Sequence, residues 1–320
     1  MGSIFPAHDR SAWITAQRPV RPAALNPFQP HGFFLEAERT ASGQITSSAT
    51  ILLTNKECPW RCLMCDLWKN TTTHTVPLGA IPQQIEHALS QLRSRPEQIK
   101  LYNSGSFFDP AAVPPADYPA IARTIAFAKR IVVESHPRLV GKKALRLRDL
   151  LSGALEVAMG LETVHPQVLP RLNKQFDLSH FSQAAAFLRN HGMTVRAFVL
   201  VKPPFLNEEE GLEWAVKSAA FAWSCGATVV SLIPTRPGNG AMERLMEAGE
   251  FSPPRLATLE EALEKTLEVR GAGRIFADTW DLERFSRCPA CFEKRRQRIN
   301  AMNLSQQILA AIECPACGGT

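Results

Sequence analysis

The chain has 320 residues, of which 45% are hydrophobic, and a formal net charge of +6. This is enough apolar material for a full α/β core, and the lack of any run of about 18 apolar residues argues against a transmembrane helix. The first ten residues lack the charged-then-apolar pattern of a signal peptide. Because the eight cysteines give no sign of a disulfide framework, we expect a cytoplasmic protein that does not bind membranes.

The order of apolar runs predicts an α/β fold. Residues 1–48 are rich in proline and weakly periodic, which predicts an extended arm packed on the main domain. Strand-like runs then alternate with stretches of helical length, and this order implies right-handed βαβ units and a parallel sheet. The expected strands are 50–54, 99–103, 130–134, 155–160, 194–201, 228–233 and an added 274–278. The expected helices are 81–94, 118–129, 142–151, 178–190, 208–224 and 256–270.

Three cysteines follow the first of these strands within eight residues: Cys58, Cys62 and Cys65, spaced CxxxCxxC. Three thiolates on one loop can hold three corners of a 4Fe–4S cluster and leave the fourth iron open. A structural zinc site usually takes four ligands, and a disulfide needs an oxidising compartment. The spacing therefore favours a cluster to which a small molecule binds and by which it is reduced.

This motif is typical of the radical S-adenosylmethionine (SAM) superfamily, which the chain resembles. The resemblance implies a partial (β/α)6 barrel with its chemistry at the carboxyl ends of the strands. It implies that SAM binds the open iron, that a flavodoxin- or ferredoxin-type donor supplies one electron, and that SAM is cleaved to a 5′-deoxyadenosyl radical. That radical abstracts hydrogen from a substrate. Cys58, Cys62 and Cys65 are accordingly expected to be both metal ligands and catalytic residues.

Motifs after the second and third strands are expected to contact SAM. In the superfamily a small turn after the second strand binds the methionine amino group through backbone oxygens, and Ser104, Gly105 and Ser106 occupy that place. The alternative for these residues is an ordinary turn. Glu134 and Ser135 end the third strand and are suited to accept hydrogen bonds from the ribose hydroxyls, unless they form only a solvated strand end.

Two further residues are assigned to the cofactor by position. Glu162 ends the fourth strand, in the segment GLET. Met64 precedes Cys65 at the place where relatives often have an aromatic residue near the adenine, and a methionine can cover an adenine face. We expect both residues to line the SAM site.

A closer similarity lies in the segments VVES-P, GLET, NK and VLVKPPFL. They resemble the radical SAM subunit of archaeosine synthase and, more distantly, the catalytic elongator subunit, over about residues 50–235. Both families act on tRNA, so the resemblance implies a modified nucleoside or tRNA as substrate. The alternative is a radical SAM enzyme that acts on a small metabolite or peptide, and a third class is a non-enzymatic metal-containing RNA-binding protein. Basic clusters at 142–148 and 294–298 suit either phosphate groups or a solvated helix face.

Two CPxC knuckles near the carboxyl end are separated by 22 residues. Such a pair predicts one site with four thiolate ligands, Cys288, Cys291, Cys314 and Cys317. Zinc in a structural role is favoured, and a second iron–sulfur cluster is the alternative. The chain is thus expected to comprise an extended arm (1–48), a radical SAM partial barrel (49–285) and a small four-cysteine extension (286–320).

Overall fold

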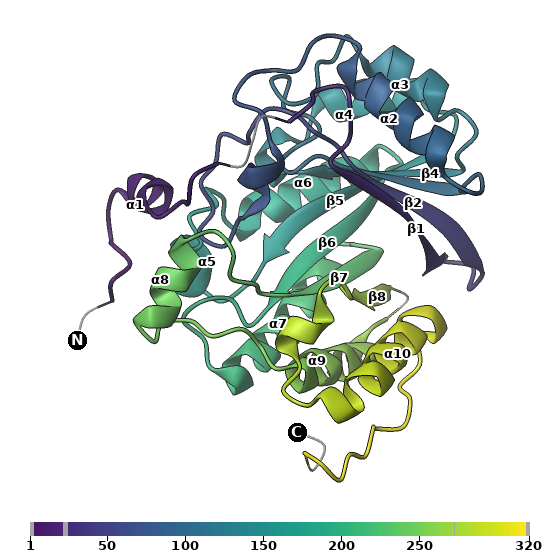
Figure 1. The fold of residues 1–320 in the computed structure, drawn as a ribbon. Helices are drawn as coiled ribbons and strands as arrows, with labels where there is room; N and C mark the ends of the chain where they lie inside the picture. The colour runs from purple at the N-terminus through teal and green to yellow at the C-terminus, as the bar shows by residue number, and fades with distance from the viewer. Residues whose placement is uncertain (1–2, 22–24, 272, 318–320) are drawn as a thin grey trace.

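The computed structural model describes residues 3–21, 25–271 and 273–317. Within them, eight strands form a single curled sheet whose spatial order follows the chain (Figure 1). β1 pairs antiparallel with β2, and every later neighbouring pair is parallel. The expected partial barrel is therefore confirmed. The strands are β1 (Gly32–Arg39), β2 (Ile45–Leu52), β3 (Gln98–Tyr102), β4 (Arg130–Ser135), β5 (Ala154–Glu162), β6 (Thr194–Val201), β7 (Val229–Pro234) and β8 (Arg274–Ala277).

The stretch before residue 48 is more ordered than the expected extended arm. It contains a short helix, α1 (Arg10–Ala16), then all of β1 and the first residues of β2. β1 pairs with β2 over its whole length. The β1 side chains are mostly half-buried, and the two faces of the strand differ little in burial. The alternation of apolar and polar residues is therefore weak, and the neighbouring prolines dominate the sequence pattern. The sequence predicted only an extended arm here and did not identify β1.

Helices cover the outer face of the sheet (Figure 1). The longer ones match the expected ranges closely, although α3 ends at Thr124 rather than at residue 129. Outward-facing strand residues such as Ile99, Val133 and Val157 pack with helix residues such as Ile85 in the main hydrophobic core. Within the described residues, no helix is both long and apolar enough to cross a bilayer. The helices are α2 (Ala80–Gln91), α3 (Tyr118–Thr124), α4 (Lys142–Leu150), α5 (Val168–Arg171), α6 (Leu178–Asn190), α7 (Glu208–Ser224), α8 (Ala241–Glu247), α9 (Leu256–Val269) and α10 (Pro289–Ser305).

The free edge of β8 is covered by side chains of α10. The Asn303 amide exchanges hydrogen bonds of 2.8 and 2.9 Å with the backbone of Ala277. Gln306, which follows the helix, does the same with Ile275 at 2.9 and 2.6 Å. These amides satisfy backbone groups that an edge strand otherwise leaves unpaired. The carboxyl-terminal extension is therefore packed onto the sheet.

The inner face of the sheet carries a buried group of charged side chains, here called the inner ionic network. The Glu38 carboxylate lies 2.5 Å from Lys100, 2.6 Å from Arg196 and 3.9 Å from Arg274, and Arg196 also pairs with Glu156 at 2.7 Å. Burial alone would raise the pKa of Glu38, but the charges of Arg196 and Lys100 outweigh it and hold that pKa well below its usual range. Because the five residues come from β1, β3, β5, β6 and β8, their meeting shows that the sheet curls until its two edge strands approach each other.

Candidate active site

The three motif cysteines lie on the loop after β2, at the carboxyl edge of the parallel strands. Cys58, Cys62 and Cys65 are all free and half-buried. Burial raises the pKa of Cys58 to about 11 and that of Cys65 to about 12. The metal-free protein therefore holds neutral thiols, and metal binding must release their protons.

The three thiols lie near enough to one another to interact electrostatically. Burial raises the pKa of Cys62, and the neighbouring Cys65 and Cys58 raise it further. In a 4Fe–4S cluster each cysteine binds a different iron, so three thiols on one loop can hold three of the four irons. This loop therefore suits such a cluster.

Segments far away in sequence hold the three-cysteine loop (residues 53–66) in place. The Leu63 amide donates to the Leu172 carbonyl at 2.9 Å. The Asn239 side-chain amide donates to the carbonyls of Leu63 and Cys65 at 2.6 and 3.2 Å. Residues after β5 and β7 thus set the conformation of the loop. Asn239 is a positioning residue whose contact with the loop was not predicted from the sequence.

The turn after β3 lies directly against Cys58. A Cβ atom on Gly105 would lie 3.2 Å from the Cys58 Cβ, so glycine permits this close approach. Ser104 adopts a φ of +53°, which is uncommon for a residue with a side chain. The Glu134 carboxylate accepts hydrogen bonds from the backbone amides of Asn103, at 2.5 Å, and Gly105, at 3.4 Å. Glu134 therefore holds this turn against the three-cysteine loop.

The two predicted strand-end motifs are also joined by their hydroxyls. Ser106 and Ser135 lie with their Oγ atoms 3.0 Å apart. Burial raises the pKa of Glu134 to about 7, although the backbone amides that it accepts from act in the opposite direction. The structure brings Ser104, Gly105, Ser106, Glu134 and Ser135 together, whereas their contacts with SAM stay predictions.

Glu162 has a partner that the sequence did not identify. It forms a buried ion pair with Lys174, whose ammonium also donates to the Gly160 carbonyl at 2.8 Å. A Cβ atom on Gly160 would collide with the Lys174 Nζ and the Glu162 carboxylate, so a larger residue there would displace this ion pair. Glu162 itself has a φ of +65°, and such backbone conformations tend to occur at functional sites. The segment NK was noted in the sequence, but nothing in it indicated that the lysine turns back to β5.

An aromatic stack links the three-cysteine loop to β4. The Trp60 and His136 rings lie 3.7 Å apart and are nearly parallel, with 7° between their planes. His136 Nε2 lies 2.9 Å from the Lys174 carbonyl oxygen. Burial and the Lys174 charge lower the pKa of His136 to about 3, so the imidazole is neutral and able to donate to that carbonyl.

The segment formed by residues 3–21 packs over the three-cysteine loop. Arg18 and Arg21 contact Glu57, which precedes Cys58, at 2.7 and 2.5 Å. Both guanidinium groups also lie over the ring of Trp68, 4.7 and 5.5 Å from its centroid. Trp68 is buried. The sequence predicted a packed arm here, but not that its arginines are the groups that fasten the loop.

Met64 lies between two small hydrophobic clusters at this edge of the sheet. It contacts the group that contains Phe5 and Met242 and also the group that contains Leu200. It is half-buried. This position leaves its expected contact with an adenine as a prediction.

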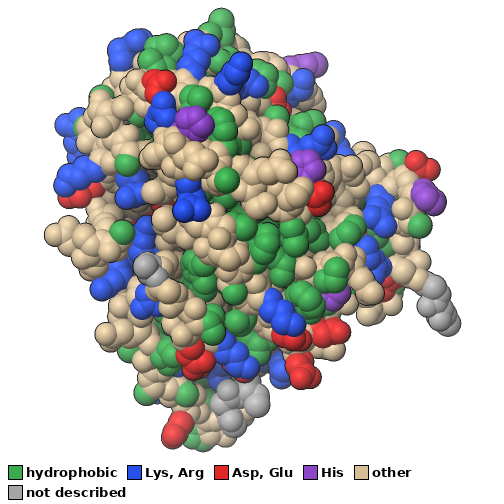
Figure 2. All heavy atoms as spheres, turned by 180° about the vertical axis from the view of Figure 1, so that it is seen from behind, with side chains coloured by type: hydrophobic (Ala, Val, Ile, Leu, Met, Phe, Trp, Pro, Cys, Tyr) green, Lys and Arg blue, Asp and Glu red, His purple; other side chains and the backbone are tan. Residues whose placement is uncertain are grey.

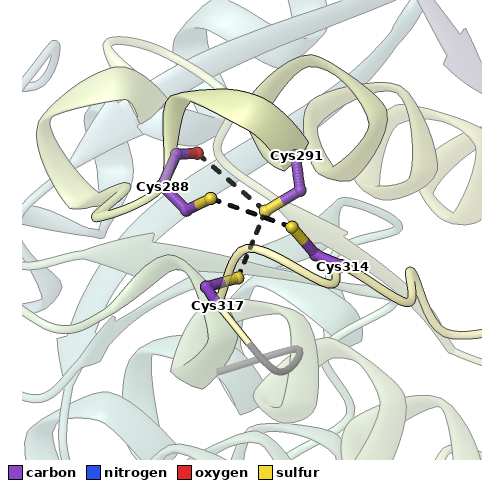
Figure 3. Close-up of side chains that lie close together, drawn as sticks. All are labelled: Cys288, Cys291, Cys314 and Cys317. Atoms are coloured by element: carbon purple, nitrogen blue, oxygen red, sulfur yellow. Dashed lines mark hydrogen bonds between the residues drawn. The ribbon is translucent and has the colours of Figure 1, made fainter.

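The four carboxyl-terminal cysteines converge, as Figure 3 shows. Cys288 precedes α10 and Cys291 lies in its first turn, while Cys314 and Cys317 lie on the chain that returns past it. All four sulfurs are within 4.8 Å of one another. The Cys288–Cys314 and Cys291–Cys317 sulfur distances are each 3.8 Å. The expected four-cysteine group near the carboxyl end is therefore confirmed.

The chain is similar to proteins of one superfamily, although no protein-family model matches it. It is 28% identical over 236 residues to archaeosine synthase subunit beta of Methanosarcina acetivorans, covering 70% of this chain and 68% of that one. It is 31% identical over 210 residues to the protein of the same name from Thermococcus kodakarensis, covering 63% and 65%. The structure of Methanocaldococcus infernus Elp3 superposes with a TM-score of 0.52 at 13% identity, over 70% of this chain and 59% of Elp3.

These relatives and the half-barrel support an enzyme that resembles the radical SAM superfamily. The chain is similar in sequence to the beta subunit of archaeosine synthase and in fold to Elp3. The predicted resemblance is confirmed.

Proposed function

We propose that this enzyme cleaves SAM reductively at a cluster held by Cys58, Cys62 and Cys65. When bound, the 4Fe–4S cluster and SAM supply the one-electron chemistry that yields methionine and a 5′-deoxyadenosyl radical able to abstract hydrogen from a substrate. The observation that carries this proposal is the contact of the Gly105 turn with Cys58 at the carboxyl edge of the sheet. A backbone surface able to bind an amino group thus lies beside the proposed iron ligand Cys58, which supports the proposal.

The remaining SAM contacts are proposed for residues around this turn. The backbone oxygens of residues 104–106 accept from the amino group of SAM, and Glu134 and Ser135 face its ribose. Glu162 and its partner Lys174 present paired charges at the next strand end. Met64 lies against the adenine. In this arrangement the chain orients SAM and excludes water, and it donates no proton to the reaction.

The proposed substrate is a modified nucleoside or a tRNA. The names of the two curated relatives support it, as do Lys142 and Arg146, which are exposed on α4. In Figure 2, Lys and Arg side chains gather on the side of the molecule where α2, α3 and α4 lie. The second basic cluster lends less support, because Arg295 and Arg298 are buried against Glu260. A small metabolite or peptide is the alternative substrate.

We propose zinc as the metal of the four-cysteine site, in an extension (286–320) added to the barrel. Four sulfurs at about 2.3 Å around one tetrahedral zinc are separated by about 3.8 Å. Two pairs in the structure have sulfur distances of 3.8 Å. A cubane cluster requires wider spacing, because its four ligands bind four different irons.

The proposed partners follow from the same chemistry. A flavodoxin- or ferredoxin-type protein supplies the electron, and the naming of the relatives as beta subunits supports a second chain in the active assembly. Eight free thiols and an oxygen-sensitive cofactor suit the reducing cytoplasm.

The test is incubation of anaerobically reconstituted protein with SAM and dithionite, followed by quantification of 5′-deoxyadenosine. Formation of 5′-deoxyadenosine above the level of a mock-reconstituted sample is expected. Absence of this product with every candidate substrate, together with tight binding of nucleic acid, would instead support the non-enzymatic RNA-binding class.

A further inference from the structure

Aromatic residues form a second layer on the inner face of the sheet, above the inner ionic network. Side chains two residues apart on a strand point to the same face. Lys100, Arg196 and Arg274 belong to the network, so the residues two positions nearer the carboxyl edge also point inward. Those residues are Tyr102, Phe198 and Phe276.

β1, which runs antiparallel to the other strands, contributes Phe34 to the same layer. Phe34 lies four residues before the network residue Glu38 on this antiparallel strand, and it therefore shares the inner face nearer the carboxyl edge. Its ring contacts that of Trp280, just past β8, with 5.7 Å between centroids. We call Phe34, Tyr102, Phe198, Phe276 and Trp280 the inner aromatic surface.

Ring contacts support this placement. The Tyr102 and Phe198 rings meet edge to face at 5.9 Å, although their strands, β3 and β6, are separated by two others. Such a contact is possible only across the concave side of the curled sheet. Phe34, Tyr102, Phe198 and Phe276 all stay half-buried, and the Trp280 side chain is 56% exposed.

The backbone of Trp280 is fixed on both sides of its exposed ring. Its amide donates to an Asp278 carboxylate oxygen at 3.1 Å, and its carbonyl accepts from Arg236 at 2.6 Å. Arg236 and Asp278 themselves pair at 2.7 Å. Arg236 is therefore occupied in holding this turn. An exposed indole on a fixed backbone is suited to stacking, because little conformational freedom is lost when a ring packs on it.

The same turn is connected to the three-cysteine loop. Lys69, just past that loop, donates to the Gly238 carbonyl, and Gly238 follows Arg236 by two residues. A Cβ atom on Gly238 would lie 3.5 Å from the Asp66 carboxylate. The segment that contains Arg236, which holds the Trp280 turn, therefore also contacts the residues next to the cysteine motif.

The charges beneath the aromatic layer are already compensated. Lys100 contacts Glu36 and Glu38, and Arg196 contacts Glu38 and Glu156. A phosphate or carboxylate brought here would have to break these pairs, whereas an uncharged ring would only cover aromatic faces.

We propose that the inner aromatic surface binds a planar, uncharged heteroaromatic ring of the substrate, with Trp280 as the stacking residue at its mouth. The inference rests on the proposed function, because it places the substrate beside the SAM site on the same carboxyl edge. Two sources share this chemistry, a free nucleoside and a base within RNA, and binding measurements separate them.

The experiment measures equilibrium binding to full-length, anaerobically reconstituted protein, without turnover. The probes are adenosine, guanosine, an unmodified tRNA transcript and ribose 5-phosphate, the last as a control without a ring. Trp280→Ala is expected to weaken binding of the ring-containing probe by about 5- to 150-fold, the range for loss of one base–aromatic stack. Trp280→Phe should restore most of the affinity, and Phe28→Ala, which removes an exposed ring outside this surface, should have no effect.

Nucleoside binding identifies a free base as the ligand, whereas binding of the transcript alone identifies a base within RNA. Equal binding by Trp280→Ala and the wild type, equally tight ribose 5-phosphate binding, or no binding of any ring-containing probe to the wild type would each overturn the inference. Iron content and thermal unfolding of the variant exclude misfolding as the cause of a loss. Because SAM cleavage is assayed separately on the wild type, failure of this inference is distinguishable from failure of the proposed function.

Discussion

The two cysteine sites of this protein are built in opposite ways. The four-cysteine site collects its ligands from two knuckles within 30 residues of each other, and all four sulfurs lie within 4.8 Å. The three-cysteine loop instead depends for its shape on hydrogen bonds with residues more than 100 positions away, such as Leu172 and Asn239. A closed local site suits structure, whereas an open site fixed by the rest of the fold suits chemistry with an exchangeable ligand.

The largest effect is expected in the three-cysteine loop. Replacing Cys58, Cys62 or Cys65 with alanine should abolish 5′-deoxyadenosine formation, because two thiolates cannot hold a cluster with an open iron. Product analysis and iron content after reconstitution are the measurements. Cys225→Ala is the matched control, since Cys225 is also a half-buried free thiol but lies outside both sites. If one of the three variants still cleaved SAM, the cysteine that it replaces would not be a cluster ligand.

Removing two of the four carboxyl-terminal cysteines should abolish metal binding at that site without affecting the three-cysteine loop. The double variant Cys314→Ala/Cys317→Ala is expected to lose about one zinc per chain while keeping about four irons. Hydrogen exchange should rise in α10 and at the β8 edge that it covers, because the metal substitutes for a hydrophobic core too small to form there. An iron content near eight in the wild type that falls to about four in the variant would identify a second cluster and refute the zinc proposal.

A pH titration of SAM binding tests the role of Glu134. Its pKa is raised from 4.5 to about 7, so the folded state binds more protons than the unfolded state and this group's contribution to stability falls as pH rises from about 4.5 to about 7. The ionised carboxylate is the better acceptor for ribose hydroxyls, so SAM affinity should increase between about pH 6 and pH 8. Glu134→Ala should weaken SAM binding by about 10- to 150-fold at the higher pH.

Isothermal titration of Glu134→Gln completes this test. The amide does not titrate, so the rise in affinity with pH should disappear in this variant. An affinity that is the same in Glu134→Ala and the wild type at both pH values would leave Glu134 with only the structural task of holding the turn at Gly105.

The smallest effect is expected at Glu57, which joins residues 3–21 to the three-cysteine loop. Burial alone would raise the pKa of Glu57, but the guanidinium groups of Arg18, Arg61 and Arg21 outweigh it and lower that pKa. Glu57→Ala leaves three cations without their partner and should lower the free energy of unfolding by about 1.5–3 kcal/mol. It should also speed loss of iron in air, measured by absorbance.

Glu293→Ala is the control, because it removes an exposed ion pair with Arg296 of little expected value. Equal iron loss from the two variants would show that residues 3–21 do not protect the loop.

The local patterns of the sequence were sufficient for the fold class and both cysteine groups. The alternation of strands and helices predicts the half-barrel, because the hydrophobic period and the length of each element can be read from a short stretch of sequence. The motifs CxxxCxxC and CPxC give the spacing of the candidate ligands directly. β1 was not predicted, because a half-buried strand in a proline-rich stretch has little contrast between its faces.

Other features arise only when distant strands meet. The pairing of Lys174 with Glu162, the fastening of the loop by Arg18 and Arg21, and the inner aromatic surface all depend on the curvature of the sheet. Their side chains carry no special spacing along the chain, and the closeness that gives them a role is a property of the tertiary structure. The sequence by itself predicted the kind of chemistry that we propose for the three-cysteine loop, and the curl of the sheet decided which side chains surround it.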